Sequence, residues 1–164
     1  MIDANNALDS GPFTPERTGN LPMSDFAGWC FSDNTTIDQV KRKLVGRGGL
    51  VAYLSTNSAK DVEKMIQEGN KEAQRVYDAM IYQIACEIGS RAVALRGKVD
   101  AIVLTGGLAH SGYVVDKLRE WVGFLAEVLV YAGEDEMKSL ALGALRVLRR
   151  EEEAKTYPEI VKDE

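Results

Sequence analysis

The most constraining feature of this sequence is a change of hydrophobic period near residue 100. Across residues 71–95, apolar side chains recur every three or four positions, which is the spacing of an amphipathic helix packed on a core. Residues 101–105 form instead a continuous apolar run, typical of a strand buried on both faces of a parallel sheet. A second run of this kind follows at residues 127–131. The fold class is therefore predicted to be α/β.

Shorter patterns predict the remaining elements. Residues 4–24 contain three prolines and two glycines and are predicted to form a loop. Ser24 and Ser58 stand where helix N-caps are expected, because a serine hydroxyl satisfies a free N–H at a helix start. Further helices are predicted at residues 24–32, 36–44, 58–69, 111–122 and 135–150. Helices that alternate with two apolar strands imply crossover connections and a parallel sheet.

Composition excludes several classes of protein. With 45% hydrophobic and 27% charged residues, the 164-residue chain is expected to pack a core rather than stay disordered. A net charge of −5 argues against a nucleic-acid partner, but not against ATP, since backbone N–H groups can hold a phosphate. Cys30 and Cys86 lack metal-binding or redox spacing and are expected to be reduced thiols. The start has no signal-peptide pattern and no apolar run is long enough for a membrane, so we expect a soluble, cytoplasmic protein.

The strongest candidate site follows the first strand. Gly106 and Gly107 carry no Cβ, so the main chain there can approach a base, a ribose or a phosphate closely. Ligands of open α/β sheets bind at the carboxyl ends of strands. From the residues alone, a ligand site and a plain tight turn are equally favoured, because neither a Walker A loop nor a dinucleotide fingerprint is present. We assign no acid–base role to His110, the single histidine.

Three acids follow the second strand, where the last helix begins: Glu134, Asp135 and Glu136. One interpretation is that a carboxylate there holds a Mg²⁺–phosphate complex. The other is ordinary favourable placement of carboxylates against the helix dipole.

Arg17 lies in a segment whose prolines and glycines restrict the backbone. A rigidly presented guanidinium suits bidentate recognition of a phosphate or a carboxylate. The alternative is a surface arginine paired with Glu16, which composition alone favours.

Taken together, these segments resemble the butyrate kinases of the acetokinase family, in the superfamily of acetate and sugar kinases, heat-shock ATPases and actin. The matching segments are Asp3–Leu8 with Gly11–Arg17, Lys43–Leu50, Asp100–Gly107, and Gly133–Met137 with Ala141–Leu148. The resemblance extends to about Tyr157. It implies that residues 1–150 form a truncated C-terminal nucleotide-binding lobe with an incomplete ribonuclease-H-like, actin-like ATPase fold. Residues 151–164 are then a charged, fraying tail.

The resemblance also implies a reaction, in which ATP with Mg²⁺ phosphorylates a short-chain carboxylate such as butyrate or isobutyrate. It assigns the adenosine contacts to Thr105, Gly106, Gly107, Leu108, Ala109 and His110, and adenine-side contacts to Ser58 and Lys60. It matches Arg17 with the arginine that bridges the carboxylate and the transferring phosphoryl group. It places either Glu134 or Glu136 near Mg²⁺, because the alignment allows both registers. Association into a homo-oligomer through this lobe is also implied.

The main departure from the family is the missing N-terminal lobe with its phosphate loops. We expect the chain alone to lack kinase activity and to have low stability, with an exposed apolar edge at residues 101–105. The alternative function is a non-catalytic remnant that binds adenine nucleotide weakly. An unrelated dinucleotide-binding fold is disfavoured, because the third glycine and the later acidic residue of that motif are absent.

Overall fold

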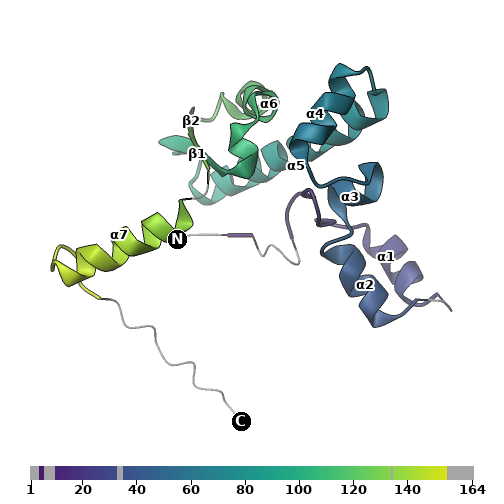
Figure 1. Ribbon diagram of the computed structural model, residues 1–164, viewed down its shortest axis with the longest axis horizontal. Coiled ribbons are helices and arrows are strands. Elements are labelled where there is room, and N and C mark those ends of the chain that lie inside the picture. The colour runs from purple at the N-terminus through teal and green to yellow at the C-terminus, as the bar shows by residue number, and fades with distance from the viewer. Residues whose placement is uncertain (1–3, 6–9, 33–34, 134, 155–164) are drawn as a thin grey trace, which may run out of the picture. The chain divides into compact units, whose positions relative to one another are not determined.

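The computed structural model describes residues 4–5, 10–32, 35–133 and 135–154 (Figure 1). Its internal contacts divide the chain into a first unit that ends at Ala132 and a second unit that begins at Gly133. Most of the predicted tail, residues 151–164, lies outside the described residues.

The first unit contains most of the regular structure (Figure 1). Its elements are α1 (Met23–Cys30), α2 (Ile37–Leu44), α3 (Gly49–Leu54), α4 (Ala59–Gln67), α5 (Lys71–Ala94), β1 (Ala101–Gly106), the 3₁₀-helix η1 (Gly107–His110), α6 (Gly112–Val122) and β2 (Glu127–Ala132). Strands β1 and β2 pair in parallel, with Ala101 opposite Glu127 and Gly106 opposite Ala132. The chain between them passes through η1 and α6. This arrangement confirms the α/β class, with parallel strands and flanking helices.

The long helix α5 has defined signals at both ends. The Asn70 side chain accepts hydrogen bonds from the N–H groups of Glu72 and Ala73, which caps the first turn. At the other end, Gly97 has a φ of 73° and its N–H donates to the carbonyl of Ala92 over 3.0 Å. The predicted helix at 71–95 is therefore confirmed, with its left-handed glycine after the last turn.

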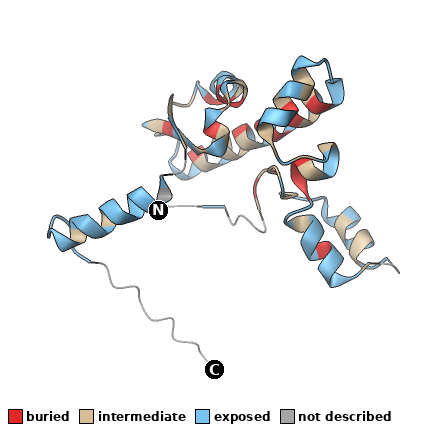
Figure 2. Cartoon of the chain, in the orientation of Figure 1, coloured by how far each residue is buried: buried red, intermediate tan, exposed pale blue. Residues whose placement is uncertain are grey.

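One cluster of buried side chains holds the first unit together, and Figure 2 shows buried positions on α4, α5 and α6. Its most buried members are Leu50, Val62, Tyr77, Met80, Ile81 and Val122. None of the described charged or polar residues is buried. The core is therefore apolar apart from the hydroxyl of Tyr77.

The sheet is buried on one face only. Ile102 and Val128 belong to the buried cluster, whereas Val103 is 57% exposed and Tyr131 is 64% exposed. Successive side chains of a strand point to opposite faces, so the odd-numbered positions of both strands form the outer face. The expectation that 101–105 is buried on both faces is wrong for this chain, because Val103 on the outer face is exposed.

Side chains cap the starts of α2 and α4, and one of the two predicted caps is confirmed. Thr36 and Gln39 form a reciprocal capping box at the start of α2, and Ser58 caps α4. The predicted cap Ser24 is wrong, because α1 begins one residue earlier and Pro22 occupies the N-cap position. Proline is tolerated at a helix start since its missing N–H would have no helical partner there.

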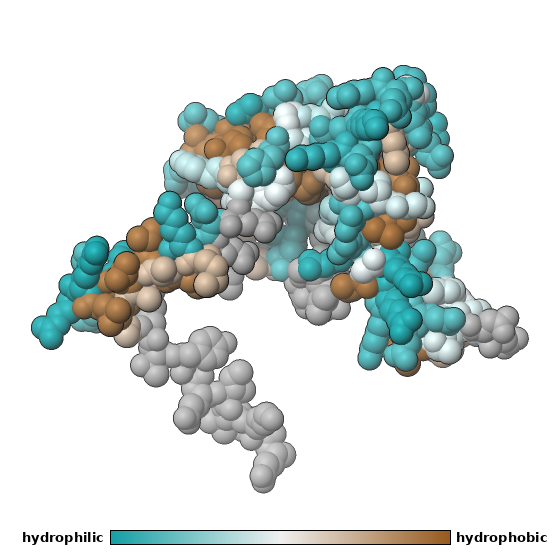
Figure 3. Space-filling model, in the orientation of Figure 1, coloured by the Kyte–Doolittle hydropathy of each residue, from teal (hydrophilic) through white to brown (hydrophobic). Residues whose placement is uncertain are grey.

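The second unit consists of α7 (Glu136–Leu148) and a short segment after it. Met137, Leu140 and Leu148 are exposed, and Figure 3 shows apolar side chains along this helix. Within the described part of the chain, no helix combines the length and hydropathy that crossing a membrane requires.

Candidate functional site

At the end of β1 the glycine segment has a half-buried Gly106 and an exposed Gly107. Gly106 has φ 80° and ψ −174°, a conformation that essentially only glycine adopts. The chain then turns into η1, where Gly107 and His110 are exposed and Ala109 is buried. Thr105 is exposed as well. The segment Thr105–His110 therefore has a required glycine and accessible backbone groups, as a site for a flat or anionic ligand needs.

Helix α6 starts directly after this segment. The Ser111 hydroxyl caps the helix by accepting a hydrogen bond from the N–H of Val114 over 3.0 Å. The same hydroxyl donates to Oε1 of Glu63, which lies on α4. The glycine segment is thus joined through Ser111 to the helix that carries Ser58 and Lys60.

Ser58 and Lys60 lie at the first turn of α4. Ser58 Oγ accepts from the N–H of Asp61 over 3.3 Å, so its hydroxyl caps the helix. Lys60 is exposed, and its ammonium group makes no ion pair with any described residue. Of these two predicted contacts, Ser58 caps a helix, whereas Lys60 has no ion pair in the part of the chain that the structure describes.

Two tyrosines support this region from inside. Tyr77 on α5 and Tyr113 on α6 stack with ring centroids 5.6 Å apart. Burial raises the pKa of Tyr113 to about 12, and its hydrogen bond to Asp78 adds to the shift. Burial likewise raises the pKa of Tyr77 well above its ordinary value, with smaller opposing and reinforcing effects from Ser111 and Glu63. Both hydroxyls therefore stay protonated donors at neutral pH.

The loop that carries Arg17 is rigid. Thr14 accepts a hydrogen bond from the N–H of Arg17 over 3.0 Å, and its own N–H donates to the Arg17 carbonyl over 3.0 Å. The Glu16 carbonyl accepts from the N–H groups of Gly46 and Gly48, at 2.8 and 3.1 Å. These contacts fix the backbone on both sides of Arg17, as the prolines and glycines of the segment predict.

The pairing of Arg17 with Glu16 does not form. The Glu16 carboxylate instead accepts from Nδ2 of Asn57 over 2.6 Å. The Arg17 guanidinium has no ion pair among the residues that the structure describes. Arg17 lines a shallow cavity of about 410 Å³ with Thr14, Pro15, Glu16 and Asn57. Since Asn57 precedes Ser58, the Arg17 loop and the start of α4 lie together.

The side chains of the two acids predicted to approach a metal lie outside the described residues. Glu134 lies outside the described residues, and Glu136 begins α7 with its side chain outside them. Among the described residues there is no group of three histidines, cysteines or acids that could hold a metal. The metal assignment thus stays a prediction.

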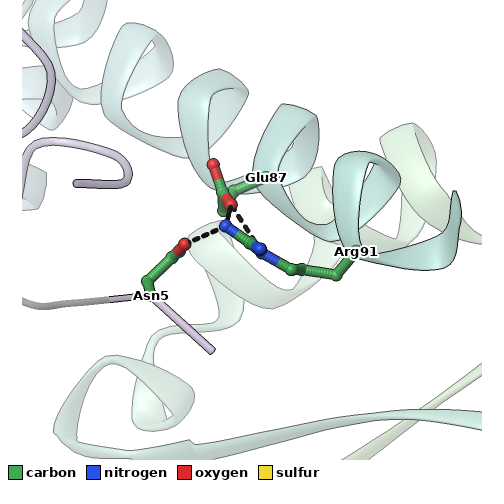
Figure 4. A network of polar contacts seen from close by, with 3 residues as sticks. All are labelled: Asn5, Glu87 and Arg91. Atoms are coloured by element: carbon green, nitrogen blue, oxygen red, sulfur yellow. Dashed lines mark hydrogen bonds and ion pairs between the residues drawn. The ribbon is translucent and has the colours of Figure 1, made fainter. Parts of the chain in front are cut away.

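The sequence did not predict the polar network around Arg91 or the groove beside α1. Arg91 donates to Oε1 of Glu87 over 2.6 and 2.8 Å, and also to Oδ1 of Asn5 (Figure 4). The i, i+4 spacing of Glu87 and Arg91 is a signal that could have indicated the ion pair. The groove has a volume of about 490 Å³ and is lined by Thr18, Leu21, Pro22, Asp25, Phe26, Trp29, Lys43, Gly49, Ala52 and Tyr53.

The sequence pattern of the acetokinase family matches residues 16–139 of this chain. The chain belongs to the acetokinase family. The matched range includes Arg17, the start of α4 and the whole glycine segment.

Solved structures of acetokinases share this fold. The chain is similar to the acetate kinase of Porphyromonas gingivalis, with 18% identity and a TM-score of 0.75 over 85% of this chain and 41% of that one. A propionate kinase from Francisella tularensis is 17% identical, with a TM-score of 0.69 over 78% of this chain and 39% of that one. The acetate kinase of Entamoeba histolytica is 18% identical, with a TM-score of 0.72 over 83% of this chain and 43% of that one. The chain therefore spans about two fifths of the length of these structures.

Proposed function

We propose that this chain is the nucleotide-binding half of an ATP-dependent short-chain carboxylate kinase. The observation that carries the proposal is the left-handed Gly106 followed by the exposed Gly107, in a segment joined through Ser111 to Glu63 of α4, in a chain of the acetokinase family. Lys60 and Arg17 make no ion pair within the described part of the chain, and ATP is a ligand that both side chains and the glycine segment could bind. As ATP is the phosphoryl donor, we also propose that the enzyme acts in the cytoplasm.

The nucleotide is proposed to contact Thr105–His110 through its adenosine part. Without Cβ atoms, Gly106 and Gly107 allow a ribose or base to lie against the backbone. Ser58 and Lys60 are proposed to approach the adenine side from α4. Ser58 would do so beside its capping role, since a hydroxyl oxygen has a second lone pair.

Arg17 is proposed to bridge the carboxylate substrate and the transferring phosphoryl group. A guanidinium offers five N–H donors in a planar fork that matches both groups. Its loop fixes the backbone, and the neighbouring Glu16 carboxylate is occupied by Asn57. Among the described residues, Arg17 has no ion pair that a ligand would have to displace.

Mg²⁺ would supply charge neutralisation on the phosphates when bound. A carboxylate such as Glu134 or Glu136 is a suitable ligand, because Mg²⁺ prefers oxygen donors. We propose that one of these two acids approaches the metal, directly or through water.

We propose butyrate or isobutyrate as the carboxylate, with butanoyl phosphate and ADP as products. The support is the resemblance of the segments around Arg17 and Gly106 to butyrate kinases. The partners are then the other lobe of the enzyme and a second copy of the chain. The share of about two fifths of the solved acetokinases favours a second candidate for the isolated chain, a weak nucleotide-binding module without phosphoryl transfer.

Isothermal titration calorimetry of the purified chain with Mg–ATP tests the proposal. We expect saturable binding that is lost in Gly107→Trp, because the indole fills the space against the backbone. Gly28→Trp is the matched control, since a side chain at this exposed position on α1 meets nothing within 4 Å. Binding that survives Gly107→Trp unchanged would remove the basis of the assignment, and so would a wild-type chain that does not bind.

A further inference from the structure

A short hydrogen-bond network joins α4 to the first turn of α6. Oε1 of Glu63 accepts from the hydroxyl of Ser111 and, over 3.3 Å, from the hydroxyl of Tyr77. Ser111 Oγ also accepts from the N–H of Val114. A serine hydroxyl has a single proton, so a Ser111 that donates to Glu63 caps the helix through a lone pair of its oxygen.

This network connects the two segments that the proposed nucleotide site needs. Ser111 directly follows the segment Gly106–His110, so Glu63 holds the downstream end of that segment. Lys60 lies three positions before Glu63, which is just under one helical turn. One carboxylate therefore sets the spacing between the glycine segment and the start of α4.

The surroundings of Glu63 make this spacing well defined. Tyr77 is fully buried, so its hydroxyl approaches Glu63 from a fixed position in the core. Its ring is held in turn by stacking on Tyr113. Glu63 thus receives donors from both α5 and α6.

A second pair of similar chemistry lies next to the first. The Tyr113 hydroxyl donates to Oδ1 of Asp78 over 2.7 Å. This pair joins α6 to α5 and does not involve α4. It offers a matched control, because its loss weakens the packing of α6 without touching the Glu63–Ser111 hydrogen bond.

We propose that Glu63 is a positioning residue of the nucleotide site, which acts through Ser111 to hold Gly106–His110 at a fixed distance from Lys60. The choice of an adenine nucleotide as the ligand rests on the proposed function. The positioning itself rests on the hydrogen bonds alone. Glu63 acts on the affinity of the site without contacting the nucleotide.

The test uses a variant that separates capping from the link to Glu63. In Ser111→Asp, the new carboxylate still caps α6, because aspartate is as good an N-cap as serine. It has no proton to donate to Glu63 and repels it. The comparison variants are Tyr113→Phe, which breaks the neighbouring pair, and Glu63→Gln, whose amide oxygen still accepts both hydroxyls.

Two measurements give the outcome. In amide hydrogen exchange without ligand, we expect residues 58–63 and 106–112 to exchange about tenfold faster in Ser111→Asp, and to stay near wild type in the two comparison variants. In titration with Mg–ATP, we expect the Kd to rise about tenfold in Ser111→Asp only, the effect of losing the hydrogen bond between Ser111 and Glu63.

Unchanged exchange in Ser111→Asp would overturn the inference, and so would faster exchange with an unchanged Kd. An equal loss in Tyr113→Phe would also overturn it, because general loosening of α6 would then explain both results. If the wild-type chain does not bind Mg–ATP, the proposed function fails. The exchange comparison would still decide whether Glu63 holds the two segments.

Discussion

At Gly49 the backbone leaves no room for a side chain. Its φ is 56°, and an added Cβ would lie 1.7 Å from the carbonyl oxygen of Thr14. That carbonyl accepts the N–H of Leu50 over 3.2 Å, so helix α3 is packed directly on the Arg17 loop. We expect Gly49→Ala to lower the free energy of unfolding by more than about 3 kcal/mol, because both the dihedral strain and the clash must be relieved.

Urea unfolding measures this change, with Gly28→Ala as the control. Gly28 lies inside α1, and a Cβ there meets nothing within 4 Å. Replacing glycine by alanine in a helix is expected to stabilise by about 0.5–1 kcal/mol. Equal unfolding free energies for the two variants would contradict the packing of α3 on the loop.

Tyr113 makes stability depend on pH in the alkaline range. Its pKa rises from an ordinary value of 10.0 to about 12 in the folded chain. The raised pKa means that its contribution is complete below pH 10 and is lost as pH rises through about 12, where the unfolded chain ionises first. We expect the unfolding free energy to fall less steeply across this window in Tyr113→Phe than in the wild type. Identical slopes in unfolding measured from pH 9 to 12 would show that Tyr113 is not the cause.

The roles of some residues could be predicted from the sequence, and the roles of others could not. Ser58 was identified as a helix cap because capping depends on residues within one turn. The role of Glu63 could not be predicted, since its partner Ser111 lies 48 positions away. For Arg17, the rigid loop followed from prolines and glycines, but the pairing of Glu16 with Asn57 depends on a contact across 41 positions.

At the scale of elements, the outer face of the sheet is exposed within the first unit. Val103 is exposed on this face, and Val128 is buried on the other. Exposed apolar strand surface promotes association of chains. We expect Val103→Lys to increase the soluble fraction without lowering the melting temperature.

Val128→Lys is the control, because it places a charge in the apolar core and is expected to prevent cooperative unfolding. Soluble yield and thermal unfolding of both variants are the measurements. A large loss of stability in Val103→Lys would mean that the outer face is covered in solution.

The long elements could be predicted from the spacing of their apolar residues, and the short ones could not. Helix α5 spans enough turns for its apolar spacing to be unambiguous, and both strands are continuous apolar runs. Helix α3 has six residues, fewer than two turns, so no periodic pattern can indicate it. Burial of the sheet on one face could not be predicted, because it depends on which other elements the chain supplies.

At the scale of the molecule, the chain supplies part of a fold that is larger in its solved relatives. It spans about two fifths of their length, and several apolar side chains of α7 are exposed. Phosphoryl transfer depends on positioning and charge stabilisation by many groups around the phosphates. We therefore expect the isolated chain to hold nucleotide without forming acyl phosphate.

The position of the bound nucleotide is the central point of the proposed function. Two-dimensional NMR of the ¹⁵N-labelled chain during a Mg–ATP titration measures this directly, one backbone amide at a time. If the nucleotide lies against the glycine segment, the largest shifts are expected at Gly106–His110 and at Ser58 and Lys60. Shifts confined to the groove between Phe26 and Tyr53, or no shifts at all at saturating Mg–ATP, would contradict this position.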